Sequence, residues 1–192
     1  MPDLTRTARL DVLVEGYARM PHVAGTVSLV RDADRVVVVD PGMVADRALI
    51  LDPLAALGVR PEDVTDVVVS HHHLDHTVNI ALFGPVPVHD FQSVLHGDRW
   101  TPRPAEGVQL TPSVTLLATP GHTPQDLTTL VGTPDDVVAL THLWWTAEGP
   151  ADDPYSLDRD QLREQRERVL DLATLVVPGH GAPFRPDPGT PR

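Results

Sequence analysis

The most informative segment of this chain reads Ser70-His71-His72-His73-Leu74-Asp75-His76-Thr77. In an extended or turning segment His71 and His73 point the same way, because side chains two residues apart share a face. Asp75 and His76 follow at a point where a helix can begin. Together these side chains could hold two metal ions close to each other. Zinc suits such nitrogen and oxygen ligands, and iron or manganese would also be accepted.

Composition restricts the ligands and partners that such a site could have. The 192 residues include no cysteine, so disulfides and thiolate metal ligands are excluded. The formal net charge of −12 argues against broad attraction to nucleic acid or to anionic membrane surfaces. The first residues contain no apolar stretch long enough for a signal peptide or a membrane span. We therefore expect a cytoplasmic protein that acts on a small-molecule substrate and can form a homodimer.

Apolar runs and turn residues predict a layered α/β protein with one domain over residues 1–192, its core from about 10 to 185 and its ends frayed. Pro53 is expected to kink or split the first long helix. The Arg and Glu residues of 159–168 are expected on the wet face of the last helix, and the tail from Pro183 is expected to fray. The predicted strands are 26–30, 35–39, 64–70, 86–89, 114–118, 127–131, 137–140 and 173–177, and the helical stretches are 45–57, the segment ending at Phe83, and 159–172.

Polar, metal-capable residues follow the ends of these predicted strands. Asp40, the 71–76 cluster, His122 and His180 each come directly after an apolar run, and His142 follows a fifth run. Apolar runs that stop abruptly at such residues are typical of a site built along one edge of a sheet. The sequence therefore predicts that residues far apart in the chain meet in a single site.

The 71–76 cluster matches the His-x-His-x-Asp-His signature of the metallo-β-lactamase superfamily. Three further segments resemble motifs of that family and occur in the same order: Val36–Gly42, Pro120–Thr123 and Pro178–Gly181. A series of motifs in order is far more specific than any one of them. The resemblance implies a four-layer αββα sandwich. The resemblance is strongest to a small member of the superfamily, which has similar residues to those at 119–124 and 176–184.

The resemblance also implies a set of site residues. Asp40 would orient a ligand imidazole, a common need at metal-bound histidines, although Asp-Pro-Gly is also a good turn on its own. Asp75 and His142 are the two residues expected to take part in catalysis. The implied metal ligands are His71, His73 and His122 for one ion, and Asp75, His76 and His180 for a second, with His142 as a further ligand.

His142 departs from the pattern of the family, in which most dinuclear members carry a metal-bridging aspartate at this position. A neutral imidazole cannot bridge as a carboxylate does, and its presence removes a negative charge worth roughly several kcal/mol in a partly dry site. Three outcomes are open: His142 binds one metal terminally, the site holds one metal, or catalysis has been lost. We favour the first, because an imidazole keeps a ligand atom within reach.

The function implied by the resemblance is that of a metal-dependent hydrolase, using one or two zinc ions and a deprotonated water on a small ester, thioester, lactone or related substrate. Three alternatives remain open. They are an iron-dependent oxidative enzyme on the same fold, a phosphodiesterase or nuclease, and a non-catalytic protein that binds metal or ligand. The acidic charge opposes the nuclease, and the nearly complete ligand set opposes the non-catalytic protein.

Several neighbouring residues have simpler interpretations. His72 is expected to point away from the site, and His22, His89 and His96 are expected in loops or on the surface. The Trp144-Trp145 pair could wall a substrate pocket or serve as plain packing. The loops near 15–25 and 144–155 are expected to shape the pocket.

Overall fold

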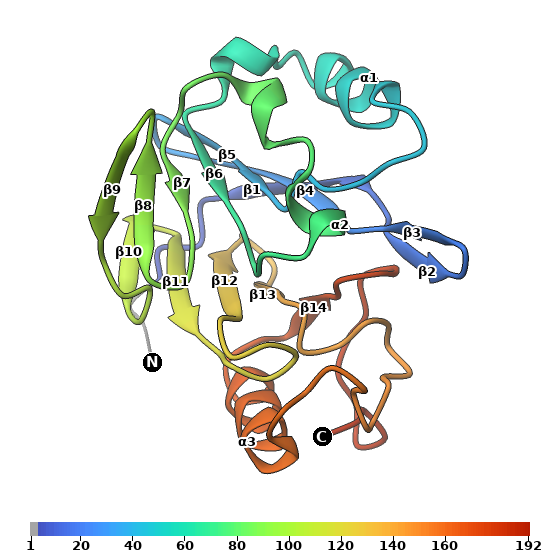
Figure 1. Cartoon of the computed structure of the whole chain (residues 1–192). Helices are drawn as coiled ribbons and strands as arrows, with labels where there is room; N and C mark the ends of the chain where they lie inside the picture. The colour runs from blue at the N-terminus through green and yellow to red at the C-terminus, as the bar shows by residue number, and fades with distance from the viewer. Residues whose placement is uncertain (1–3) are drawn as a thin grey trace.

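Two mixed β-sheets lie face to face in the computed structural model, which describes residues 4–192 (Figure 1). The first sheet has the strand order β1-β4-β5-β6-β7-β8-β9 and the second the order β10-β11-β12-β13-β14, while β2 and β3 form a separate hairpin. The bounds in the first sheet are β1 (Arg9–Val14), β4 (Val27–Asp32), β5 (Arg35–Val39), β6 (Asp66–Val68), β7 (Val88–His89), β8 (Ser93–His96) and β9 (Arg99–Pro102). Those in the second sheet and the hairpin are β10 (Val108–Thr111), β11 (Val114–Ala118), β12 (Leu127–Gly132), β13 (Val137–Leu140), β14 (Leu175–Val177), β2 (Tyr17–Arg19) and β3 (His22–Ala24).

Helices cover the outer face of each sheet, so that the fold has four layers. Helix α1 (Ala48–Ala56) lies on the first sheet and α3 (Arg159–Leu170) on the second (Figure 1). The short helix α2 (Leu74–Thr77) and two 3₁₀ turns, Pro61–Asp63 and Ile80–Phe83, complete the helical elements. The predicted four-layer α/β sandwich is confirmed. None of the helices in residues 4–192 combines the length and apolar character that crossing a membrane requires.

Side chains alternate along each strand, so one apolar run contributes to the core on both faces of its sheet. In β5, Val37 and Val39 join the core between the two sheets, while Val38 joins the core under α1. In β11, Leu116 faces the core between the sheets and Leu117 faces α3. Successive side chains on a strand point to opposite faces, so a strand covered on both sides has no polar face. This explains the continuous valine runs in the sequence.

Helix α1 continues through Pro53 and is not split as the sequence led us to expect. Proline removes the hydrogen bond to the carbonyl four residues earlier, which here belongs to Leu49. Leu49 lies on the solvent side of the helix, where water can satisfy that carbonyl. The helix ends at Ala56 with Leu57 as its C-cap, and Gly58 follows with a φ of 73°. Glycine adopts this left-handed conformation without steric cost, as predicted for a helix cap.

Two segments differ from the predicted surface pattern. Arg166 of α3 is fully buried instead of lying on the wet face, and it donates to the carbonyl groups of Leu143, Pro150 and Ala151. A buried guanidinium requires such acceptors, and carbonyls of a neighbouring loop supply them. The tail expected to fray is instead tied to the domain, because the Pro191 carbonyl accepts a hydrogen bond of 2.8 Å from the Trp144 indole.

The direction of the strands places the metal-capable residues that follow them at one end of the sandwich. Strand β5 is parallel to β6, and β13 is parallel to β14, so the carboxyl ends of each pair share an edge. The two edges are joined by backbone hydrogen bonds from Leu127 to Ser70 and from Thr26 to Gly179, each 2.8 Å long. The predicted site at one sheet edge is therefore a site between two edges, one from each sheet.

The layered core predicts a strong contrast between two leucines of one helix. Leu54→Ala should lower the free energy of unfolding by about 2–5 kcal/mol, because Leu54 is fully buried under the first sheet and its removal leaves a cavity. Leu49→Ala is the matched control: Leu49 is 48% exposed, and its change should be within about 0.5 kcal/mol. Urea unfolding followed by circular dichroism measures both. Equal losses in the two variants would contradict this assignment of the core.

Candidate metal centre

The structure brings all seven sequence-predicted ligand residues together at the end of the sandwich. They come from the loop after β6, from α2, and from the loops after β11, β13 and β14. Each ring of the cluster lies within van der Waals reach of others; the His122 and His142 ring centroids, for example, are 4.1 Å apart. Three groups have ligand atoms within 4.8 Å of one another: His71, His73 and His122; Asp75, His76 and His180; and His71, His76 and His142.

The first group is a triangle of imidazole nitrogens. Nδ1 of His73 lies 3.0 Å from Nε2 of His71 and 3.2 Å from Nε2 of His122. In the second group Oδ2 of Asp75 lies 3.5 Å from Nε2 of His76 and 3.4 Å from Nε2 of His180. These spacings are close to the edge of about 3.3 Å expected for a tetrahedral zinc site with Zn–N bonds of about 2.0–2.1 Å.

The remote nitrogens of four imidazoles are fixed by hydrogen bonds. Nδ1 of His76 donates to Oδ2 of Asp40 at 2.9 Å, and Nδ1 of His122 donates to Oδ2 of Asp153 at 2.7 Å. Nδ1 of His180 donates to the Ala24 carbonyl at 2.9 Å. The Ser70 hydroxyl uses its own proton on Asp40, so it accepts from Nδ1 of His71 at 3.1 Å. Such contacts set the tautomer of each neutral ring and leave Nε2 as a lone-pair donor.

These tautomers place unshared electron pairs against one another. Nε2 of His71 and Nε2 of His122 both face Nδ1 of His73, and one proton on that atom cannot serve both fully. Nε2 of His76 is buried without any hydrogen-bond partner. A buried polar atom without a partner costs about 1–3 kcal/mol, and a shared cation removes that cost for several nitrogens at once. The donor set therefore fits a metal ion.

The Asp40-Pro41-Gly42 turn has two functions in this centre. Oδ1 of Asp40 accepts from the Ser70 amide at 2.6 Å, so the carboxylate connects the ends of β5 and β6 and reaches His76. A side chain at Gly42 would overlap the Asp75 carbonyl, so only glycine lets this turn approach α2. Asp40 thus contacts a candidate ligand imidazole, and the turn is more than a simple chain reversal.

The turn that carries His122 is shaped by a buried acid. Asp126 accepts from the Thr123 amide at 2.9 Å and from the Thr123 hydroxyl at 2.6 Å. Burial raises the pKa of Asp126 to about 6, although these hydrogen bonds oppose the rise. The threonine after the Gly-His pair is therefore a structural element of the motif.

His142 differs from its neighbours because nothing fixes its remote nitrogen. Its Nε2 lies 3.0 Å from Nε2 of His180, inside the cluster, whereas its Nδ1 is buried with no partner. Gly179 lies directly against this ring, and a side chain there would collide with it. The imidazole therefore points into the centre, and its ligand atom is within reach of the other nitrogens.

Burial controls the charge of the cluster. Burial and the neighbouring imidazoles lower the pKa of His71 and of His142 well below the ordinary value of 6.5. Burial also lowers the pKa of His73 and of His180. In His76 burial acts in the same direction, but the charge of Asp40 outweighs it and the pKa is raised. The rings are thus kept mainly neutral, the form that binds metal.

Asp153 is a site residue that the sequence analysis missed. It is buried, its Oδ2 accepts from the Trp145 indole at 2.8 Å as well as from His122, and its Oδ1 accepts from the Tyr155 amide. Burial raises the pKa of Asp153, but the hydrogen bond to His122 and the other contacts outweigh this and lower it. No local pattern separates it from Asp152 beside it, and only its burial identifies it.

A cleft of about 490 Å³ opens onto the cluster. Both segments predicted to shape the pocket contribute, the 15–25 region as the β2–β3 hairpin and the 144–155 loop through Trp145 and Tyr155. Each tryptophan fits one of the two interpretations given for the pair. Trp145 lines the cleft, whereas Trp144 is fully buried and packs against Phe184. The cleft is lined by Ala18, Met20, Val23, Met43, His73, Leu74, Asp75, His122, His142, Trp145, Tyr155 and His180.

The remaining histidines lie outside the cluster. His72 points away and contacts Asp90 at 3.1 Å, and His22 and His96 are exposed, as expected. His89 was expected in a loop or on the surface, and this is wrong: it is buried in β7 and contacts Asp66 at 2.9 Å. Asp66 lies on the neighbouring strand β6 and gives Nε2 of the buried ring a partner, which offsets part of the cost of burying it, whereas Nδ1 has no partner.

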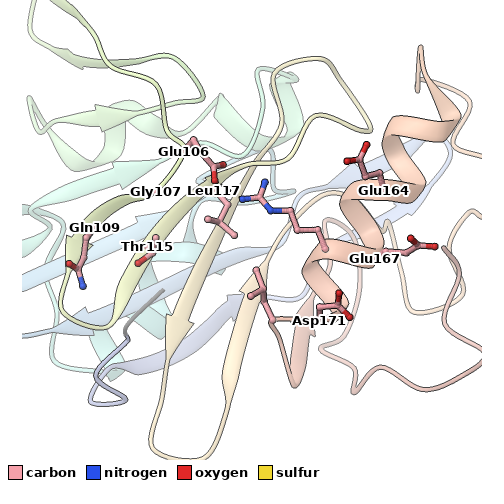
Figure 2. Close-up of a pocket in the computed structure, with 10 residues that line it drawn as sticks. Glu106, Gly107, Gln109, Thr115, Leu117, Glu164, Glu167 and Asp171 are labelled. Atoms are coloured by element: carbon pink, nitrogen blue, oxygen red, sulfur yellow. Dashed lines mark hydrogen bonds and ion pairs between the residues drawn. The ribbon is translucent and has the colours of Figure 1, made fainter. Parts of the chain in front are cut away.

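A larger groove of about 790 Å³ lies between β10–β11 and α3, and it shares no lining residue with the histidine cleft. Figure 2 shows the acids Glu164, Glu167 and Asp171 along α3, across the groove from Glu106. Arg168 donates to Glu106 at 2.6 Å and to the Ala118 carbonyl at 3.0 Å. This groove is the solvated face predicted for the helix, and its size does not make it the chemical site.

The chain resembles known proteins in sequence and in fold. Residues 20–86 match the model of the metallo-beta-lactamase superfamily. The chain is 32% identical to metallo-beta-lactamase domain-containing protein 1 of Xenopus laevis over 198 residues, covering 92% of this chain and 81% of that protein. It is 38% identical to the Homo sapiens protein of the same name over 159 residues, covering 78% of this chain. It spans 59% of the length of that human relative.

Solved structures with low sequence identity share the fold. A crystal structure of a Thermotoga maritima protein assigned to the metallo-beta-lactamases has a TM-score of 0.74 at 22% identity, covering 94% of this chain and 100% of that one. An N-acyl homoserine lactone hydrolase with N-hexanoyl-L-homoserine bound at its catalytic metal centre has a TM-score of 0.62 at 18% identity, covering 88% of each chain. These likenesses concern the fold.

The contact between Asp153 and His122 predicts a measurable effect on metal binding. Asp153→Asn should weaken zinc affinity about 10–100-fold, because the neutral amide makes the imidazole a weaker ligand. Competition with a chromophoric chelator measures the affinity. Asp152→Asn is the matched control, since the Asp152 side chain is 74% exposed and its variant should bind zinc as the wild type does. Equal affinities in all three proteins would show that Asp153 does not support a ligand.

The lowered pKa values predict that the metal-free protein loses stability in acid. A histidine whose pKa is lower in the folded state than the ordinary 6.5 binds a proton preferentially when the chain unfolds. Stability should therefore fall as the pH falls below about 6.5, by up to about 1.4 kcal/mol per pH unit for each such imidazole. His76, with its raised pKa, acts in the opposite direction, but His71 and His142 outnumber it.

Urea unfolding in the presence of a chelator, from about pH 7.5 to about pH 5.5, measures this slope. The double variant His71→Gln, His142→Gln should reduce the slope, because it removes two of the imidazoles. Wild-type stability that stays constant or rises in acid would contradict the assignment.

Proposed function

Because this chain belongs to the metallo-β-lactamase superfamily, we propose that it is a metal-dependent hydrolase acting on a small ester, thioester or lactone. The observation that carries the proposal is the set of imidazoles whose remote nitrogens are fixed and whose free nitrogens converge on the floor of a cleft. A purely structural histidine cluster has no need to face its lone pairs toward one another or to open onto a cleft. The sequence identity to the Xenopus laevis relative supports the family, and the activity is our inference.

Two zinc ions are the cofactor that this donor set suits best. One would be held by His71, His73 and His122, and the other by Asp75, His76 and His180. Bound zinc would supply a water of lowered pKa and would polarise the carbonyl group of the substrate. Nitrogen and carboxylate ligands also bind iron or manganese, but the neutral imidazoles of this centre are ordinary zinc ligands.

The protein's own residues have separate tasks around that chemistry. The Asp75 carboxylate lies at the cleft beside His76 and His180. With Oδ2 among the ligand atoms, its other oxygen, Oδ1, would be left to accept a proton from an attacking water. Trp145 and Tyr155 are stacked with ring centroids 5.9 Å apart and wall the cleft against solvent. Asp40 and Asp153 hold two of the rings, and thereby keep their free nitrogens directed at the reacting centre.

His142 sets the balance between one metal ion and two. We propose that its Nε2 binds one ion terminally, because that atom already lies among the other ligand nitrogens. An imidazole leaves the charge of two dications less compensated than a bridging carboxylate does, so the second ion should bind more weakly. A site that binds metal without turnover is the competing interpretation, and it rests on this same substitution.

Metal content and hydrolysis together test the proposal. Wild-type protein purified without chelator should contain about two zinc ions per chain, and His142→Ala about one, because a ligand of the weaker ion is lost. Elemental analysis measures the metal. The zinc-loaded protein should hydrolyse aryl esters, thioesters or lactones, lose this activity with chelator, and regain it with zinc.

A control variant and two outcomes make the test decisive. His72→Ala should retain wild-type metal content, because His72 points away from the cluster. One zinc ion or fewer in the wild type, rising to two in His142→Asp, would show a site tuned away from the dinuclear form. Absence of hydrolysis in the fully loaded protein with all three substrate classes would favour the non-catalytic interpretation.

A further inference from the structure

The cleft above the candidate metal centre has an apolar rim. Met20 and Val23 reach it from the β2–β3 hairpin, Met43 from the turn after β5, and Leu74 from the start of α2. Tyr155 faces them from the far side, its ring 5.7 Å from that of His73. We call these five side chains the apolar rim. Figure 1 shows the hairpin projecting beside α2. Ala18, Met20 and Val23 of the hairpin line the cleft.

The apolar rim is unusually exposed for residues of this type. Met20 is 86% exposed and Leu74 is 68% exposed, and both lie next to side chains that point at the candidate metal centre. Large apolar side chains gathered on a surface lose contact with water only when something covers them, so such patches mark binding sites. Methionine is flexible and polarisable and adapts to varied alkyl shapes. The rim is therefore suited to cover an apolar group.

In the described residues, the rim of the cleft has no Lys or Arg side chain that could pair with an anionic group of a substrate. The chain has no lysine, and none of its arginines is among the residues that line the cleft in the described part of the chain. Arg19 is adjacent to Met20, but Ala18 and its cross-strand partner Val23 line the cleft, so Arg19 and its partner His22 lie on the other face of the hairpin. A carboxylate or phosphate lying on the rim, away from the candidate metal ions, would meet apolar side chains and no Lys or Arg partner.

We propose that the substrate is uncharged and carries an apolar chain, which lies on the apolar rim while its carbonyl group faces the histidines. This inference rests on the proposed hydrolase function and names its substrate class. Burying an alkyl chain against the rim stabilises the complex in proportion to the area covered. Burying an ionised group there would cost its hydration without returning a partner. The cleft thus selects by polarity as well as by size.

A substrate series tests the inference with the zinc-loaded protein. In aryl esters with acyl chains from about two to about ten carbons, kcat/KM should rise about two- to fourfold per added methylene until the rim is covered. The same esters with a terminal carboxylate should be at least about tenfold poorer. Rates that are independent of chain length, or a preference for the carboxylates, would overturn the inference.

A charge introduced on the rim provides a reciprocal test. Met20→Lys should weaken the preference for long uncharged chains and improve the terminal carboxylates about threefold, because the new ammonium group faces the cleft. Leu157→Lys is the matched control: Leu157 is 84% exposed, does not line the cleft, and its variant should keep the wild-type preference. Identical specificity in the two variants would show that the rim does not contact the substrate.

Binding of alkyl hydroxamates separates failure of this inference from failure of the proposed function. The hydroxamate group binds zinc and the alkyl chain samples the rim, so calorimetry should show tighter binding with each methylene whether or not the protein turns over esters. Chain-dependent binding without hydrolysis would overturn the hydrolase proposal and retain the apolar rim. Hydrolysis with chain-independent binding would do the reverse.

Discussion

The hydrogen bonds of the Asp40 carboxylate hold the candidate metal centre together. It accepts the amide and hydroxyl protons of Ser70 and the Nδ1 proton of His76, so one buried side chain connects two strand ends and directs two imidazoles, one of them through the serine. Asp40 itself adopts a φ of 52°, a strained backbone conformation for a residue with a side chain. The surrounding hydrogen bonds hold it there, and Gly42 brings the same turn against α2.

The histidine cluster places unshared electron pairs close together, and a bound metal ion would accept them. Burial keeps most of its imidazoles neutral, and fixed tautomers direct their free nitrogens toward one another. In the metal-free protein these nitrogens lack adequate partners, which lowers stability, as expected at sites built for a ligand. An imidazole must be neutral to bind a metal ion, and a ring that burial already keeps neutral has no proton to lose near pH 7. The burial that destabilises the metal-free centre therefore favours metal binding.

The outer layers also contribute to the centre. Arg166, buried under the second sheet, donates to three carbonyls in the loop that continues to Asp153. That loop supplies the acid beside His122 and the aromatic wall of the cleft. A guanidinium has five donors in a rigid fork, so it can fix several backbone positions at once. The helix that covers the sheet therefore also positions a loop of the site.

The side chains that meet in the centre could be predicted from the sequence. Apolar runs that end at metal-capable residues predicted a layered α/β fold and the clustering of the histidines, because strand ends and side-chain alternation are local properties. The four layers were expected from the resemblance to the metallo-β-lactamase superfamily. Three other residues could be assigned their roles only from the way distant segments pack together. Asp153 lies 31 residues from His122, Arg166 occurs in a charged stretch that reads as solvated, and His89 is buried by strands distant in sequence. Their roles depend on which surfaces pack together, and no local pattern records that.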